Sequence, residues 1–466
     1  MRKEEFARAA KGAVKGTHPA KGRLPVNRAV PVNGREAALE ALLQIWEEGA
    51  YAAIALDRVL RQAKLDEQDR RFATELANGA VKAKGTLDFL LEQMVNRPLQ
   101  TLEPAVRYIL HLGLYQIFYL ERIPDSAACN ESVNLAKKFS HTGTDKFVNG
   151  VLRNTVRQKE ILWEKVQEDD SLRLCHPRWL AARWQKQFGD EGAEALCLWD
   201  NEPPNLCLRI NPLMTTREAF LQDLREMGCE AEVSLWCPDG LVITKSPGLS
   251  VLLQTFPHSF YVQDESSMLP AMVLQAKSGE TVLDMCAAPG GKATHIAALM
   301  DNKGHITACD IYPHKLKLIE ENAKRLGLEI IQTVLQDGTV LREDWTEAFD
   351  RVLVDAPCSG LGVLRRRAEA RWTKTEKGLR DFPVLQHKIL ENASCYVKHG
   401  GVLVYSTCTV EDNENRIQIE RFLQKHREWK QAEFAHPRTQ QAVKELQLYP
   451  QRDGTDGFYL TLLRKE

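Results

Sequence analysis

The chain has 466 residues, 44% of them hydrophobic, and a formal net charge of −1 at pH 7. Its length predicts about three domains. A net charge this close to zero excludes nucleic-acid binding through overall positive charge, so any such binding needs a local basic patch. The eleven cysteines lack close pairs and no His/Cys cluster has zinc spacing, so we predict neither a disulfide framework nor a metal. No apolar stretch suits a signal peptide or a membrane span, which predicts a cytoplasmic protein.

Residues 1–34 are rich in lysine and arginine, contain glycine and proline, and lack hydrophobic periodicity. This composition predicts a disordered basic arm. The arm either contacts RNA or is a solvated tail, and the sequence favours neither.

Residues 35–168 follow a helical pattern. Apolar side chains recur at i, i+3, i+4 and i+7, as in Leu39, Leu42, Leu43 and Trp46. Short loops with proline or glycine separate the segments, so we predict a helical bundle. The phrases DRRFATELANG and KFVNGVLRN resemble the NusB-like RNA-binding domain. Besides the first helix, we expect helices at 66–84, 86–96, 104–120, 125–139 and 145–159.

Residues 169–262 are predicted to connect this bundle to the C-terminal part. The stretch 169–203 has helical parts and ends at two prolines. A small α/β unit follows over 204–262, which either touches RNA or only packs against its neighbours. Its expected elements are a strand at 206–210, a helix at 216–227, and strands near 230–235 and 241–244.

Residues 263–466 alternate regularly between strands and helices. Near-continuous apolar strands between amphipathic helices predict a parallel sheet covered on both faces. The last stretch, 457–464, alternates like an antiparallel edge strand. The expected parallel strands are 281–284, 305–310, 330–335, 351–354 and 402–405.

A glycine turn, Ala-Pro-Gly-Gly-Lys, follows the first of these strands. Gly290 and Gly291 let a ligand approach the backbone, and the next helix offers free N–H groups and a positive dipole end. The turn is not a phosphate-binding P-loop, because Cys286 stands where that motif needs glycine. The dinucleotide G-x-G-x-x-G is also absent. An ordinary strand-to-helix turn stays the alternative.

Polar or reactive residues follow almost every strand of this region. In open α/β sheets the ligand lies outside the carboxyl ends of the strands, so these residues should meet there. Asp310 has the spacing of an acid that accepts both ribose hydroxyls of a nucleoside. Asp337 is placed to meet an adenine amino group. The fourth and fifth strands run into Asp355-Ala-Pro-Cys358 and Ser-Thr-Cys408.

Five phrases carry a resemblance over roughly the last 200 residues: LDMCAAPGGKAT, ACDIYPHKL, LQDGT, VDAPCSGLGVLRRRAEARW and YSTCTVEDNEN. They resemble class I S-adenosylmethionine-dependent methyltransferases of the RNA cytosine-5 family. With the NusB-like region in front, the chain resembles the bacterial 16S ribosomal RNA members of that family. The implied fold is an all-α NusB-like bundle, a small α/β domain and an α/β Rossmann-like methyltransferase domain.

Two cysteines at neighbouring strand ends fit the chemistry of cytosine C5. That carbon is a poor nucleophile until a thiolate adds to C6, and a proton must leave C5 before the thiol is expelled. The resemblance implies that Cys408 is the nucleophile, that Cys358 assists release and that Asp355 bonds the N3/N4 edge. Lys292 lies close by in the sequence motif and can lower a thiol pKa. The alternative, that both cysteines are buried packing residues, suits Cys395 better, and we also expect packing roles for Cys286 and Cys309.

The resemblance also implies the cofactor, S-adenosylmethionine. Its expected contacts are Ala287, Ala288, Pro289, Gly290, Gly291, Lys292, Asp310, Asp337 and Asp355.

The expected partner is 16S ribosomal RNA in an unassembled or partly assembled small subunit, and we expect the protein to be a monomer. The basic run Arg365, Arg366, Arg367 and Arg371 is placed to contact phosphates, although such runs are more often solvated. The target base must be unpaired or flipped to reach the thiol. Two alternatives stay open: a cytosine-5 methyltransferase acting on transfer RNA, and a catalytically silent RNA-binding assembly factor. An NAD-dependent oxidoreductase is the weakest, because the dinucleotide glycines are absent.

Overall fold

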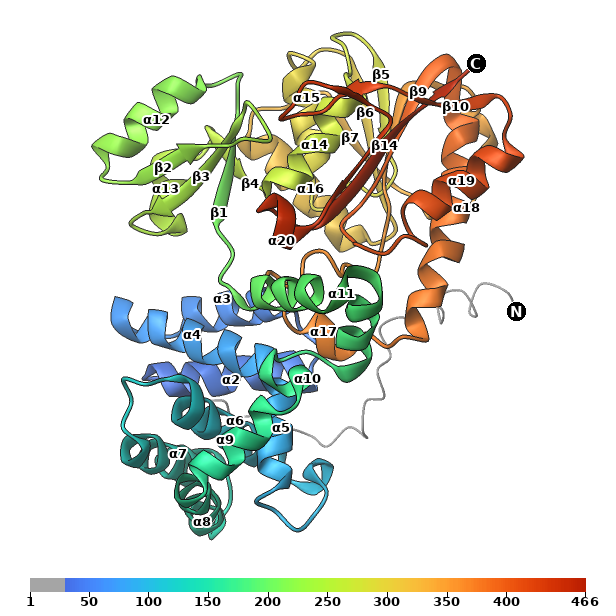
Figure 1. Cartoon of the computed structure of the whole chain (residues 1–466). Helices are drawn as coiled ribbons and strands as arrows, with labels where there is room; N and C mark the ends of the chain where they lie inside the picture. Colours follow the sequence, from blue (N-terminus) through green and yellow to red (C-terminus); the bar gives the residue numbers. More distant parts are fainter. Residues whose placement is uncertain (1–29) are drawn as a thin grey trace. The chain divides into compact units, whose positions relative to one another are not determined.

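The computed structural model describes residues 30–466, so almost all of the predicted basic arm lies outside the described residues. The chain forms two compact units, drawn in Figure 1. Among the described residues, the first comprises 30–203 together with Leu364–Glu376, and the second comprises Pro204–Val363 and Lys377–Glu466. Within residues 30–466, every helix is too short or too polar to cross a membrane.

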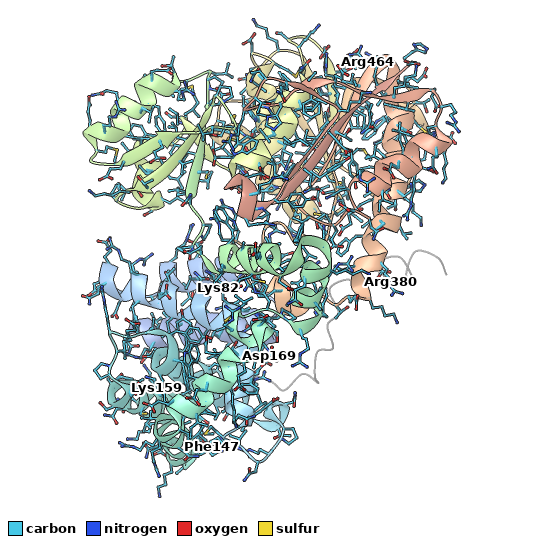
Figure 2. All side chains as sticks on the ribbon, in the orientation of Figure 1. Lys82, Phe147, Lys159, Asp169, Arg380 and Arg464 are labelled. Carbon is cyan, nitrogen blue, oxygen red and sulfur yellow. The ribbon has the colours of Figure 1, made fainter. Side chains whose placement is uncertain are left out.

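The first unit contains the helical bundle predicted for residues 35–168, and the stretch 169–203, which the sequence predicts to be a connector, belongs to the same unit. Its first helix begins with reciprocal caps: Asn33 accepts a bond from the backbone N–H of Glu36, and the Glu36 carboxylate accepts one from Val32. Asp169, labelled in Figure 2, caps a later helix by accepting from the N–H of Ser171. The helices are α2 (Gly34–Glu47), α3 (Ala52–Gln62), α4 (Glu67–Lys82), α5 (Lys84–Glu92), α6 (Pro104–Tyr119), α7 (Asp125–Phe139), α8 (Thr144–Arg157), α9 (Lys159–Gln167), α10 (Asp170–Arg173) and α11 (Arg178–Asn201), with the 3₁₀ turn η1 (Leu99–Thr101).

Helix α6 is the centre of the bundle. It is buried around its whole circumference, while α2, α4, α5, α7 and α8 pack on it. A helix that is apolar on all sides needs such a shell, because no face can be left to water. Leu39 and Leu42 of α2 belong to the same core, which confirms the helical stripe read from the sequence.

The segment 364–376, with helix α17 (Ala370–Thr373), belongs to the helical unit although it follows the fourth parallel strand in sequence. Arg371 is fully buried and donates to the carbonyl oxygens of Cys175 and Asp200 and to the side chain of Asn201. The indole N–H of Trp372 donates to the carbonyl oxygen of Val81 at 2.8 Å. These bonds fix the segment in the bundle.

Burial corrects the expectation that the basic run faces phosphates for Arg365 and Arg371, whereas Arg366 is half-buried. Arg371 has no exposed surface, and Arg365 is 6% exposed with its guanidinium over the ring of Trp199 at 4.3 Å. Only Arg367 is exposed, and it lies over the ring of Tyr51. A count of charges along the chain cannot distinguish a solvated face from side chains that pair with buried carbonyls and aromatic rings.

The small α/β part of the second unit is a four-stranded antiparallel sheet with strand order β2-β3-β1-β4. Phe220, Leu224 and Leu252 pack on Leu208 and Ile210 of the first strand. The elements are β1 (Leu206–Ile210), α12 (Arg217–Glu226), β2 (Glu230–Val233), β3 (Gly240–Lys245), α13 (Leu249–Thr255) and β4 (Phe260–Val262).

The larger part of the second unit is an eight-stranded mixed sheet with order β10-β14-β9-β8-β5-β6-β7, and β13 pairs with β14. Helices cover both faces, which confirms the predicted Rossmann-like class: α14, α15 and α16 on one core, α18 and α19 on the other. The strands are β5 (Thr281–Asp284), β6 (His305–Asp310), β7 (Ile331–Leu335), β8 (Phe349–Asp355), β9 (Val397–Thr407), β10 (Trp429–Ala432), β13 (Glu445–Leu448) and β14 (Phe458–Lys465), beside the hairpin β11 (Phe434–Ala435) and β12 (Ala442–Val443). The helices are α14 (Glu265–Leu274), α15 (Gly291–Leu299), α16 (Pro313–Arg325), α18 (Asp381–Tyr396), α19 (Arg416–Lys425) and α20 (Pro450–Asp453), with η2 (Glu343–Trp345) and η3 (Gly378–Arg380).

The last strand is antiparallel as expected, but it is not an edge strand. β14 pairs with β9 on one side and with β10 and β13 on the other, and its first six residues are buried. The short strands β10 and β13 carry too weak a pattern to be recognised from the sequence.

Candidate active site

The predicted site residues gather where the sheet order reverses. From β5 the chain continues outward to β6 and β7, and then returns to β8 and β9 on the other side of β5. All four pairings are parallel, so the carboxyl ends of these strands lie on one edge. Crevices at such a reversal are the common ligand sites of open α/β sheets.

The glycine turn after β5 closes tightly. The N–H of Gly290 donates to the carbonyl oxygen of Ala287 at 2.7 Å, and Gly290 has a φ of 104°. A Cβ atom at Gly290 would also lie 3.2 Å from the Cα atom of Ile319, so glycine is required twice over. Helix α15 begins at Gly291, and its first N–H groups are available to an anionic or polar ligand.

An ion pair links this turn to the end of β8. Lys292 Nζ lies 2.7 Å from Asp355 Oδ2, and Ser406 Oγ donates to Asp355 Oδ1 at 2.9 Å. Burial lowers the pKa of Lys292, whereas Asp355 and, to a smaller extent, Cys408 raise it. The raising effects together outweigh burial, so the pKa of Lys292 lies above its ordinary value. Lys292 is therefore a fixed ammonium beside the carboxylate.

The two candidate cysteines touch. Cys358 Sγ and Cys408 Sγ are 3.2 Å apart, in the loop after β8 and at the end of β9. The pKa of the Cys358 thiol is raised well above its ordinary value, first by the hydrogen bond with Cys408 and then by burial. The raised pKa means that Cys358 holds its proton more firmly than a free thiol does, and the Sγ–Sγ contact is a hydrogen bond between the two cysteines.

The two other acids that the sequence predicts for the cofactor lie at the end of β6 and just after β7. Asp310 is 8% exposed and accepts a bond from the N–H of Tyr312 at 2.9 Å, with Lys315 Nζ at 3.6 Å. Asp337 accepts from both the N–H and the hydroxyl of Thr339. Each carboxylate is thus oriented by its own turn and keeps lone pairs for a ligand.

One buried acid was missed from the sequence. Asp284, the last residue of β5, has no exposed surface, and burial with the nearby Asp355 raises its pKa to about 7. Its Oδ2 has no hydrogen-bond partner among the described residues. A buried unpaired oxygen at a strand end points to a ligand group, and the only sequence signal was an acid at the end of an apolar run.

The polar run after Cys408 braces the site instead of facing a ligand. Glu414 accepts from the N–H of Ser359 at 2.9 Å, and the Asn415 side chain bonds both Thr407 and the carbonyl oxygen of Thr409. These bonds fix the backbone on both sides of each cysteine. The motif YSTCTVEDNEN by itself does not indicate this role for Glu414 and Asn415.

Gly362 brings a third segment against the cysteine loops. Its N–H donates to the carbonyl oxygen of Cys408 at 3.1 Å, and its own carbonyl accepts from Gly457 at 2.7 Å. A Cβ atom there would lie 2.2 Å from the oxygen of Gly457. No larger residue fits this approach without moving the loop that carries Cys358.

The remaining cysteines differ in burial. Cys309 is fully buried in the core and Cys286 partly so, in keeping with packing roles. Cys395 is exposed on α18, which corrects the expectation that it is buried. It lies on the opposite side of the helix from the buried Ile389 and Ala393.

One group of side chains could hold a metal ion. Ligand atoms of Cys237, Asp239 and His295 lie within 4.8 Å of one another. Burial lowers the pKa of His295 to about 4, and the charge of nearby Arg209 contributes. Because the same charge would repel a cation, we assign no metal to this group.

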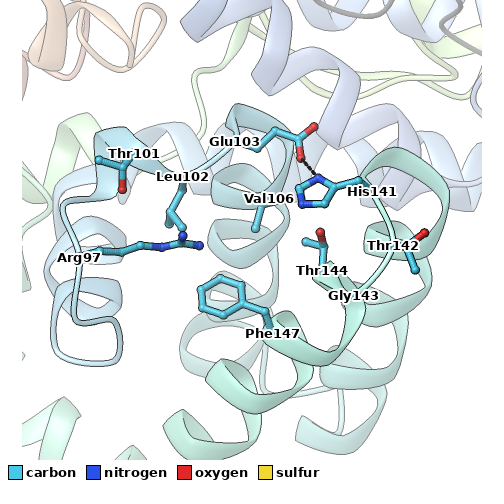
Figure 3. Close-up of a pocket in the computed structure, with 10 residues that line it drawn as sticks. All are labelled: Arg97, Thr101, Leu102, Glu103, Val106, His141, Thr142, Gly143, Thr144 and Phe147. Carbon is cyan, nitrogen blue, oxygen red and sulfur yellow. Dashed lines mark hydrogen bonds and ion pairs between the residues drawn. The ribbon is translucent and has the colours of Figure 1, made fainter.

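A hollow of about 510 Å³ lies on the helical unit between the 97–106 segment and the α7–α8 turn (Figure 3). The guanidinium of Arg97 lies over the ring of Phe147 at 5.1 Å, and Glu103 Oε2 is 3.2 Å from His141 Nδ1. An unstacked base can stack on an aromatic ring such as Phe147, and a cation such as Arg97 can contact its phosphate, so this hollow has groups that suit a nucleotide.

Family models match three parts of the chain. The model described as 16S rRNA methyltransferase RsmB/F matches residues 271–464, the NusB family model matches 32–157, and the RsmF/B-like ferredoxin-like domain model matches 176–250. The domains therefore follow one another in the order that the sequence predicts.

Individual relatives match nearly the whole chain. The probable ribosomal RNA small subunit methyltransferase B of Bacillus subtilis is 40% identical, over 93% of this chain and 98% of the relative. Methyltransferase B of Photorhabdus laumondii is 33% identical, over 93% and 99%. Among solved structures, PH0851 is 27% identical with a TM-score of 0.82, over 94% of this chain and 100% of that one. NSun6 from Pyrococcus horikoshii, solved with SFG, is 26% identical with a TM-score of 0.55, over 62% and 98%. The chain belongs to the RsmB/F family of 16S ribosomal RNA methyltransferases.

Proposed function

We propose that the protein methylates C5 of a cytosine in 16S ribosomal RNA, with S-adenosylmethionine as methyl donor and a covalent bond between Cys408 and C6. The observation that carries the proposal is the contact of two thiols beside a Lys–Asp pair at the topological reversal. The family and the curated relatives support the 16S substrate.

Cys408 is the better nucleophile of the pair. Cys358 shares a hydrogen bond with it, and the Lys292 ammonium is close enough that Cys408 contributes to the raised pKa of Lys292. The reciprocal effect favours the thiolate form of Cys408. The thiolate adds to C6, and the electron pair of the C5–C6 double bond shifts toward C5, in conjugation with C4 and N3. C5 thereby becomes nucleophilic.

Asp355 and Lys292 match the charge that develops in the ring. Ser406 and Lys292 occupy one lone pair on each carboxylate oxygen, so two sites stay open to accept from the exocyclic amino group. The ammonium at 2.7 Å offsets the negative charge that N3 and O2 acquire.

Cys358 suits the second half of the reaction. The largest cause of its raised pKa is the hydrogen bond with Cys408, and this cause disappears once Cys408 is bonded to carbon. Cys358 then ionises more easily and can take the proton from methylated C5. The electron pair of that C–H bond re-forms the double bond and expels the Cys408 thiolate.

The residues present fit S-adenosylmethionine, which supplies an electrophilic methyl group when bound. The glycine-bounded turn provides a close backbone approach, Asp310 can accept ribose hydroxyls, and Asp337 lies at the next strand end for the adenine amino group. The unpartnered Oδ2 of Asp284 can accept from the amino group of the methionine part. Ala287, Ala288 and Pro289 line the same turn.

The substrate can be tested on RNA from a strain that lacks the gene. Bisulfite sequencing should show one 5-methylcytosine lost from 16S ribosomal RNA, and the purified protein with S-adenosylmethionine should restore it. Loss from a transfer RNA would show that the substrate is wrong. If no cytosine changes in either RNA class, cytosine-5 methylation itself is wrong.

A further inference from the structure

Strand β1 of the small sheet presents one charged side chain on the face opposite its own core. Leu208 and Ile210 pack among the helices of the small domain, and alternation directs Arg209 to the other side. Arg209 is 2% exposed. A guanidinium this deeply buried is costly unless its N–H groups are all used productively.

The partners of Arg209 belong to the cofactor turn. Its Nη1 donates to the carbonyl oxygen of Gly291 and to the Gln263 side chain, and its Nη2 donates to Thr294 Oγ1 at 3.0 Å. Thr294 in turn donates to the carbonyl oxygen of Gly290 at 2.7 Å. Arg209 therefore binds the turn and the first helical residues from behind, and leaves the N–H groups of the turn for a ligand.

The ring of Tyr261 completes this support. The guanidinium of Arg209 lies over it at 5.1 Å, and a Cβ atom at Gly291 would lie 3.1 Å from the same ring. The hydrogen bonds of the Arg209 guanidinium go to neutral groups. Asp239 acts on it only through its charge, and burial has the larger effect on the Arg209 pKa, so the hydrogen bonds of Arg209 serve to hold geometry.

We propose that Arg209 is a positioning residue for the methyl donor, through which the small domain holds residues 290–294 in the shape that binds S-adenosylmethionine. This inference rests on the proposed function. It gives the small domain a part in cofactor binding beside the two roles, RNA contact and packing, that its sequence leaves open.

A second attachment of the small domain provides the matched control. Asn211, two residues further along the chain, donates to the carbonyl oxygens of Leu326 at 3.0 Å and His258 at 3.1 Å. It is 4% exposed, so its loss removes a comparably buried attachment. Leu326 follows helix α16 and is not part of the cofactor turn.

The test measures S-adenosylmethionine affinity by calorimetry on the full-length protein without RNA, together with thermal unfolding. Arg209→Met should weaken binding by at least roughly tenfold, since a displaced site can lose about a hundredfold. Arg209→Lys should recover part of the affinity, because an ammonium can still reach one carbonyl. Asn211→Ala should lower the unfolding temperature but keep the affinity within about twofold of wild type.

Thr294→Val keeps the test informative if Arg209→Met fails to fold. This substitution removes the hydroxyl that accepts from Arg209 but keeps the shape of the side chain. We expect weaker S-adenosylmethionine binding and unchanged RNA affinity. Equal losses of affinity in Asn211→Ala and in the Arg209 variants would show a general structural role and overturn the inference. So would wild-type affinity in both Arg209→Lys and Thr294→Val. If the wild-type protein itself does not bind S-adenosylmethionine, the proposed function fails instead.

Discussion

Replacing Cys358 should affect attack and release separately. Cys358→Ala removes the S–H group that lies 3.2 Å from Cys408, so the nucleophilic thiolate loses a hydrogen-bond donor. Cys358→Ser keeps a hydroxyl donor at the same place and is the matched control. Both variants lack the thiol that takes the C5 proton, so methylated RNA should stay covalently attached to Cys408.

The size of the effect on attack follows from the hydrogen bond. Bonds to charged groups contribute about 1.5–3 kcal/mol, and a thiol is a weak donor, so roughly 1.5 kcal/mol applies. Since 1.36 kcal/mol corresponds to one pKa unit, this equals about one pH unit. The donor stabilises the thiolate, so its loss raises the pH at which Cys408 ionises. Attack by Cys358→Ala should need about one unit higher pH and be roughly tenfold slower at neutral pH.

The assay follows the RNA–protein adduct on denaturing gels in single-turnover reactions, from about pH 6 to about pH 9. Cys408→Ser should form no adduct, because a hydroxyl is scarcely ionised at these pH values. An adduct in Cys408→Ser but in neither Cys358 variant would reverse the roles of the cysteines. Superimposable pH profiles for wild type and both Cys358 variants would refute the hydrogen-bond argument.

Four further outcomes are expected. Asp310→Ala should weaken S-adenosylmethionine binding by roughly 2–4 kcal/mol, for two charge-assisted bonds to the ribose, and unchanged affinity in calorimetry would contradict this. Gly85→Ala should lower the free energy of unfolding by about 1–2 kcal/mol, because its Cβ atom would lie 2.4 Å from the Trp372 ring. Gly150→Ala, which meets nothing within 4 Å, should raise it by up to about 1 kcal/mol in the same denaturant titrations. Phe147→Ala should weaken RNA binding in gel-shift assays while leaving S-adenosylmethionine affinity unchanged, and an unaffected RNA affinity would exclude the hollow as an RNA contact.

Elements with strong local patterns could be predicted from the sequence. The strands 281–284 and 305–310 were expected with the bounds that β5 and β6 have, because apolar runs that end in turn residues allow little other choice. Helix α7 also has the expected bounds. The interior place of β14 was not foreseeable, since it depends on pairing with β10 and β13, two short strands whose own sequence patterns are too weak to recognise.

The topology of the sheet made it predictable that the candidate site residues lie close together. The contacts between their side chains were not predictable. Parallel strands must present their carboxyl ends together, so Asp355 and Cys408 were expected to be neighbours before any coordinates. The Lys292–Asp355 pair, the orphaned oxygen of Asp284 and the support from Arg209 depend on side-chain packing between distant segments. No local pattern encodes such packing.

The place of the segment 364–376 constrains how the role of the helical unit can be established. A chain that lacks the described residues up to Pro203 would leave Arg371 and Trp372 without the carbonyl groups that they bind. A buried donor without its acceptor costs about 1–3 kcal/mol, so such a truncation would destabilise the chain shortly after Cys358. Lost methylation in a truncated protein would therefore not distinguish RNA selection from damage beside the catalytic loop. Substitutions on the bundle surface, such as Phe147→Ala, leave these anchors intact, and only they can show that the bundle selects the RNA.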